Sequence, residues 1–180
     1  MEINTQCISG HIEQIANKVN EQFNNSKELI RGKILNKIKG YITPLPIHYE
    51  WQNDDCPYDH SGKLIENGII NLNQTITEFL ENEYTGGTEA TYISGNGLRY
   101  NTFGDDLSNF TLKMGGEILY NTTRQYLEDF FGQSIPDEIF DNIMDEYHDE
   151  IYDNCLASDF FSYEAAIEFV GIGNIKLTQL

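Results

Sequence analysis

The chain has 180 residues and is strongly acidic, because 29 Asp and Glu against 11 Lys and Arg give a formal net charge of −18. This length fits one domain with a hydrophobic core, and the sequence lacks both a run of about 18 apolar residues and a leader, so we expect a soluble, cytoplasmic protein. Such a charge repels nucleic acid and membranes and attracts basic partners. Three widely spaced cysteines exclude a disulfide framework and are expected to be reduced thiols.

The acidic residues are concentrated toward the C-terminal end. Residues 1–40 hold 6 basic and 4 acidic side chains, residues 41–100 hold 2 and 9, and residues 101–180 hold 3 and 16. Solubility alone is the simplest explanation of acidity. A binding function therefore has to come from a local pattern rather than from composition.

Two amphipathic helices are expected at the N-terminus. Ser9 is placed to cap the first, and Ser26 to cap a second that ends near Gly40. The first carries the apolar positions Ile12, Ile15, Val19 and Phe23. The second holds five of the eleven basic residues, which we interpret as a solvated face rather than a nucleic-acid contact. We treat residues 1–42 as a helical region packed on or appended to a body of residues 43–180, within a single compact domain overall.

A loop rich in aromatic residues follows Pro44 and Pro46, which break regular structure. Cys56 and His60 stand four residues apart in it, with His48 as the only further nitrogen ligand nearby. A zinc site needs four ligands, and no second Cys/His pair completes this one. We therefore expect no metal and no cofactor.

The middle of the chain predicts a helix over 69–82 and then a β-hairpin. Gly86-Gly87 stops the helix, and the turn signal Gly95-Asn96-Gly97 predicts that residues 88–93 pair with residues 98–103.

A second strand pair is expected after an acidic turn at residues 104–106. Its strands are Phe110–Met114 and Glu117–Tyr120, joined by Gly115-Gly116. The predicted fold class is therefore α+β, with a small antiparallel sheet over about residues 88–120 that is covered by helices and flanked by helical N- and C-terminal regions.

Helices are expected over most of the remaining chain. One begins at Thr122 or Thr123 and ends at Gly132. For the next, Ser134 supplies a cap and Pro136 occupies the first turn. A stripe of apolar residues in this helix is expected to be buried: Ile139, Phe140, Ile143, Met144, Tyr147 and Ile151. A helix over 158–170 and a short strand over 175–177 complete the prediction.

The helix that follows Pro136 is unusually acidic. Its aspartates recur at every fourth residue, and no Lys or Arg occurs between residues 136 and 153. The eight acids are Asp137, Glu138, Asp141, Asp145, Glu146, Asp149, Glu150 and Asp153. Four residues rise about 6 Å, close to the spacing of phosphates along a nucleic-acid strand. We hypothesise that these acids bind a basic partner by imitating a phosphate backbone. The alternative is a solvated acidic face.

The middle segment resembles a known family. Glu83-Tyr84 before Gly86-Gly87, then Tyr92-Ile93-Ser94 and a Gly/Asn turn, is similar to the core of the ArdB/KlcA antirestriction proteins, which protect plasmid and phage DNA from type I restriction enzymes. The matching motif residues are Tyr84, Gly86, Gly87, Tyr92, Ser94, Asn96 and Gly97. The similarity runs from about residue 73 to 127. The turn reads Ser-Gly-Asn-Gly where the family has Ser-Asn-Gly-Gly, and the acidic helix lies outside the resemblance.

The resemblance implies a phage or plasmid protein that inhibits a bacterial DNA-defence nuclease of the restriction or CRISPR type by protein contact, without binding nucleic acid or membrane itself. An immunity protein that neutralises a basic nuclease toxin would show the same charge. A metal-dependent enzyme is the third reading. Catalysis is not expected, because no nucleophile motif occurs and His148 stands alone among carboxylates.

Overall fold

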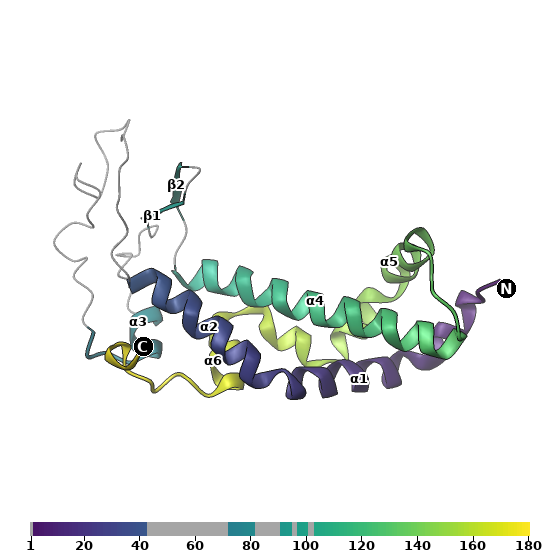
Figure 1. Cartoon of the computed structure of the whole chain (residues 1–180), viewed down its shortest axis with the longest axis horizontal. Helices are drawn as coiled ribbons and strands as arrows, with labels where there is room; N and C mark the ends of the chain where they lie inside the picture. The colour runs from purple at the N-terminus through teal and green to yellow at the C-terminus, as the bar shows by residue number, and fades with distance from the viewer. Residues whose placement is uncertain (1, 43–71, 82–90, 95–96, 101–102) are drawn as a thin grey trace.

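The computed structural model describes residues 2–42, 72–81, 91–94, 97–100 and 103–180, and most of these residues are helical (Figure 1). The α-helices are α1 (Ile12–Asn25), α2 (Lys27–Ile42), α3 (Ile76–Glu81), α4 (Phe103–Phe131), α5 (Asp137–Asp153) and α6 (Tyr163–Val170). The 3-10 helices within these ranges are η1 (Thr5–His11), η3 (Leu156–Phe161) and η4 (Leu177–Gln179). The predicted α+β class is therefore wrong, and the protein is mainly helical.

The largest correction concerns α4. This helix runs without interruption through the residues that were predicted to form an acidic turn and a second strand pair. Its buried positions continue one helical stripe across the glycines: Leu107, Thr111, Met114, Leu119, Thr123 and Leu127. Gly115 lies on this stripe, where an added Cβ would stand 3.5 Å from the Phe23 ring and 3.6 Å from Phe160. The Gly-Gly pair thus marks a close helix contact and not a turn.

A two-stranded hairpin is the only sheet in the described part of the chain. Strand β1 (Thr91–Ser94) pairs antiparallel with β2 (Gly97–Tyr100), and Ile93 lies opposite Leu98. This register is the one that the sequence predicts. Phe103, which the prediction included in the second strand, belongs to α4.

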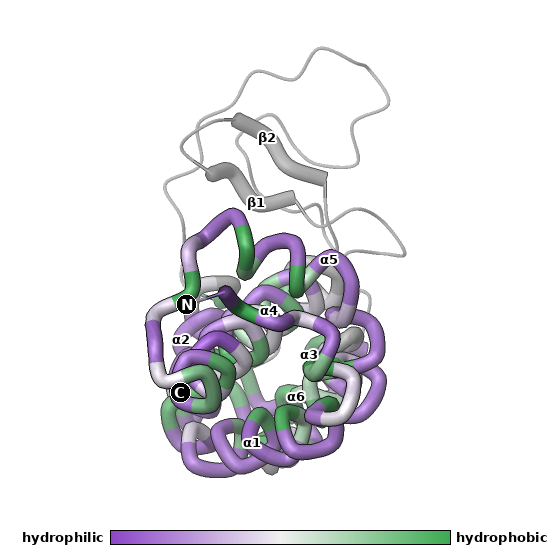
Figure 2. Tube along the Cα trace, turned by 90° about the vertical axis from the view of Figure 1, so that its right-hand side faces the viewer, coloured by the Kyte–Doolittle hydropathy of each residue, from purple (hydrophilic) through white to green (hydrophobic). Residues whose placement is uncertain are grey.

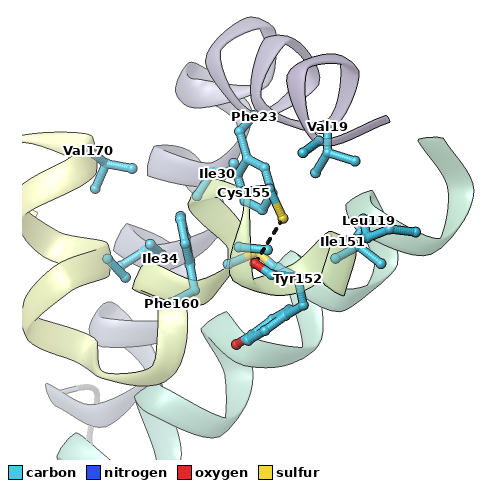
Figure 3. Close-up of a cluster of buried hydrophobic side chains, with 14 of the residues drawn as sticks. Val19, Phe23, Ile30, Ile34, Leu119, Ile151, Tyr152, Cys155, Phe160 and Val170 are labelled. Atoms are coloured by element: carbon cyan, nitrogen blue, oxygen red, sulfur yellow. Dashed lines mark hydrogen bonds between the residues drawn. The ribbon is translucent and has the colours of Figure 1, made fainter. Parts of the chain in front are cut away.

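The helices share one hydrophobic core. Helices α1 and α2 follow one another along α4 in the opposite chain direction, while η3 and α6 run back beside it (Figure 1). The view along the long axis shows the helices grouped around a common interior (Figure 2). Figure 3 shows part of this core, which includes Val19, Phe23, Ile30, Ile34, Leu119, Ile151, Phe160 and Val170.

Two predicted boundaries near the N-terminus differ from the structure. Ser9 does not cap α1, since it lies inside η1 and donates its hydroxyl to the Gln6 carbonyl over 3.3 Å. Asn4 caps η1 instead, accepting from the Gln6 N–H at 3.1 Å. Helix α2 begins directly after Ser26 but continues past Gly40.

The C-terminal segment packs against the start of α3. The Thr75 N–H donates to Glu78 Oε2 at 2.8 Å and the Glu78 N–H donates to Thr75 Oγ1 at 3.2 Å. This capping box sets the start of the helix at Ile76 rather than at residue 69. The predicted final strand is wrong: Lys176 makes only an isolated bridge with Thr75, and Leu177 begins η4. The helix predicted over 158–170 is divided into η3 and α6. Ser162 caps the start of α6.

Replacing Gly116 by Ala tests whether α4 is continuous. An added Cβ at Gly116 meets nothing within 4 Å, so Gly116→Ala is expected to raise the free energy of unfolding by about 0.5–1 kcal/mol through helix propensity. Urea denaturation followed by circular dichroism measures this change. Gly132→Ala is the matched control and is expected to destabilise, because Gly132 has φ +67°. Destabilisation by Gly116→Ala would contradict the helix.

Candidate partner-binding surface

The loop between α4 and α5 fixes where the acidic helix begins. Gly132 takes the left-handed conformation that reverses the chain after α4. The backbone N–H of Ile135 donates to Glu128 Oε1 at 2.9 Å, and the Ile135 side chain is buried. The predicted cap by Ser134 is wrong, because α5 begins after Pro136 without a side-chain cap. Carboxylates in the first turn of α5 suit the positive end of the helix dipole instead.

One face of α5 is buried, as its apolar spacing predicts. The buried residues are Phe140, Ile143, Met144, Tyr147, Ile151 and Tyr152. Ile139, predicted with this stripe, is only half-buried, and Tyr152 was not predicted. These residues pack on α4, α1 and η3.

A cluster of five side chains joins the first turns of α5 to α4, and we name it the α4–α5 clasp: Tyr120, Arg124, Asp137, Phe140 and Asp141. The guanidinium of Arg124 lies 4.7 Å from the centroid of the Phe140 ring and donates to Asp137 Oδ1 at 2.6 Å. The Tyr120 ring meets Phe140 edge-on at 4.8 Å, and its hydroxyl donates to Asp141 Oδ1 over 3.1 Å. Tyr120 and Arg124 are four residues apart on α4, and Asp137 and Asp141 are four residues apart on α5. Each pair therefore lies on one face of its helix.

The contacts of the clasp favour the protonated forms of the Arg124 guanidinium and the Tyr120 hydroxyl, because the pKa values of both groups are raised. The hydrogen bond to Asp137 raises the pKa of Arg124. Desolvation, followed by the hydrogen bond to Asp141, raises the pKa of Tyr120. The Asp137 side chain is 87% exposed, so water screens the ion pair and the buried Phe140 ring contributes more to stability.

All eight predicted acids of α5 are exposed, and we call them together the acidic α5 surface. Among the described residues, Arg124 is the only Lys or Arg that forms an ion pair with one of them. Two of the lysines of α2 lie elsewhere, with Lys27 above the Phe169 ring and Lys37 above the Phe110 ring, each at 5.3 Å. Within the described residues, this surface therefore has almost no neutralising groups.

The aspartates do not form a straight line. Each step of four residues turns about 40° further around the helix, so the five aspartates wind through about 160° from Asp137 to Asp153. The three glutamates extend the acidic arc. Asp137 and Asp141 are engaged in the clasp, whereas Asp145, Asp149 and Asp153 face solvent, with Asp149 beside His148 Nδ1 at 3.1 Å. We call these last three the outer aspartates.

Other predicted sites are only partly described. Tyr84, Gly86, Gly87 and Asn96 of the motif lie outside the described residues, as do His48, Cys56 and His60, whereas Tyr92, Ser94 and Gly97 belong to the hairpin strands. Within the described ranges, no group of three or more His, Cys, Asp and Glu could hold a metal ion. The helices there also lack the length and apolar character needed to cross a bilayer.

Replacing Phe140 by Ala should detach the acidic helix from α4. Phe140 is fully buried, so Phe140→Ala is expected to lower the free energy of unfolding by about 3–5 kcal/mol. Chemical denaturation monitored by circular dichroism measures the loss. Leu112→Ala, at a side chain that is 37% exposed on α4, serves as the control and should change stability by about 0.5 kcal/mol or less. Equal losses in the two variants would contradict the clasp.

Cys155 should be protected from alkylation in the folded protein. Burial raises the pKa of its thiol, which donates to the Tyr152 carbonyl over 3.3 Å (Figure 3). Iodoacetamide at mildly alkaline pH should therefore modify the half-buried Cys7 before Cys155, as peptide mass mapping can show. Because the unfolded thiol loses its proton first, this residue's contribution to stability should fall as pH rises above about 9, and Cys155→Ala should remove that fall. Faster labelling of Cys155 would contradict its burial.

Comparison with known proteins gives no match to a family model, to a curated protein or to a solved structure. A function is therefore inferred from the acidic α5 surface and the α4–α5 clasp that holds it.

Proposed function

We propose that the protein binds a basic DNA- or RNA-processing protein through the acidic α5 surface and thereby inhibits a bacterial defence nuclease of the restriction or CRISPR type. The observation that carries this proposal is the exposure of all eight acids on a helix whose opposite face is buried. A basic groove that normally holds phosphates would meet carboxylates held in place by a folded body.

The absence of Lys and Arg among the acids of α5 supports a partner-binding surface over a solvated acidic face. Like charges four residues apart cost roughly 0.2–0.5 kcal/mol per pair in a helix, and acids near the C-terminal end also oppose the helix dipole. A helix shaped only for stability would gain from Lys at some of these positions, yet none occurs between residues 136 and 153. Repulsion between the acids of α5 lowers stability, and this cost is explained if the same acids provide affinity for a partner.

The charge also explains how such a partner would be found. A net charge of −18 attracts a positively charged surface over distances up to the Debye length, which is about 8 Å at physiological salt. Association should therefore be fast at low salt and slower at high salt. The resemblance of the middle segment to ArdB/KlcA proteins is the reason for choosing a DNA-defence nuclease among the possible basic partners.

Replacing the outer aspartates by Asn tests the proposal. The triple variant Asp145→Asn, Asp149→Asn, Asp153→Asn leaves the clasp intact and removes three charges, so it should weaken inhibition at least about tenfold. The readout is the plating of unmodified phage on cells that carry restriction or CRISPR systems, with and without the gene, followed by cleavage assays on the nuclease that responds.

A control variant with the same change in net charge distinguishes the effect of the acidic α5 surface from the effect of the protein's overall charge. The variant Glu13→Gln, Glu28→Gln, Glu168→Gln alters three exposed acids on α1, α2 and α6. It should inhibit within about twofold of the wild type, since exposed charges outside the partner-binding surface contribute little to affinity. Equal effects of the two triple variants, or unchanged inhibition by the outer-aspartate variant, would refute binding through α5.

A further inference from the structure

A second surface, separate from the acidic α5 surface, lies between α2 and α4. It is a groove of about 380 Å³ whose apolar residues are Leu29, Ile30, Met114 and Ile118. Ile30 and Met114 are buried, but Leu29 is 61% exposed, the highest value among the exposed large hydrophobic residues of the described chain. A single exposed Leu is common on protein surfaces, but Leu29 continues the apolar lining of a groove, and this combination is what suggests an interaction surface.

The charges around this groove are balanced, unlike those of the whole protein. Lys33 on α2 and Glu117 on α4 both line the groove and are exposed, and within the described residues neither forms an ion pair. Helix α2 is also the only described α-helix with an excess of basic residues, holding five Lys and Arg against one Glu. Two copies of a protein with charge −18 meet the least repulsion through such a face.

We infer that this groove is the interface of a two-fold symmetric homodimer, in which Leu29 of each copy enters the groove of the other. Two-fold symmetry presents the same patch on both copies, so a groove with its own exposed Leu is self-complementary. In the dimer that we infer, α2 of each copy lies across α4 of the other, so that Lys33 of each copy meets Glu117 of the other and two ion pairs form without net charge at the interface. The acidic residues of α5 do not line the groove.

Sedimentation equilibrium over a range of protein concentrations tests the dimer. The wild-type chain should sediment as a reversible dimer, and Leu29→Asp should raise the dissociation constant at least about tenfold. Leu112→Asp is the matched control: Leu112 is 37% exposed on α4 but does not line the groove, so its variant should dimerise like the wild type. A monomeric wild type, or equal effects of the two variants, would overturn the inference.

Charge reversal tests the symmetry. Lys33→Glu and Glu117→Lys should each weaken the homodimer, because each places like charges opposite one another. Mixing the two single variants should form a heterodimer tighter than either homodimer by at least about tenfold, since both cross-pairs then join opposite charges. A contact between Lys33 and Glu117 of the same copy predicts no such preference. Failure of the mixture to associate would overturn the two-fold arrangement, whatever partner the acidic α5 surface binds.

Discussion

The burial of one face of α5 is the constraint on which the rest of the molecule depends. Eight exposed carboxylates on a helix of 17 residues oppose helix formation through several unfavourable pairs of roughly 0.2–0.5 kcal/mol each. Burying a side chain such as Phe140 or Ile143 contributes about 1.5–3 kcal/mol, and six residues of α5 are buried. Packing therefore outweighs repulsion, and α1, η3 and α4 together provide the surface on which this packing occurs.

The elements that follow from the sequence are those whose apolar positions repeat without interruption. Helices α1, α2 and α5 were predicted because their buried residues recur at helical spacing. The part of α4 before Thr122 is not predicted, because Gly115-Gly116 suggests a turn, although Leu107, Thr111 and Met114 already follow the helical repeat; the part from Thr122 to Phe131 agrees with the predicted helix. The cost of two glycines in a helix, about 1 kcal/mol each, is offset by the contact of Gly115 with Phe23 and Phe160, which local sequence does not reveal.

The acidic α5 surface was also predicted only in part. The exposure of the eight acids follows from their positions relative to the apolar stripe, and the structure places all of them outward. The support by Tyr120 and Arg124 was not predicted, because these residues were assigned to a strand and to a separate helix. Their spacing of four residues becomes informative only once both belong to α4. The comparison of the aspartates with phosphates along a strand considers only the rise of the helix, whereas a step of four residues also turns the side chain by more than one helical turn.

The clasp divides the acids of α5 between two roles. Asp137 and Asp141 hold the helix to α4, whereas the outer aspartates make no contact with Lys or Arg in the described chain. Substitutions at the outer turns can accumulate during evolution without loss of the fold, while the first turn stays under selection for folding. A lineage that meets a changed target can thus vary its recognition residues and keep its scaffold.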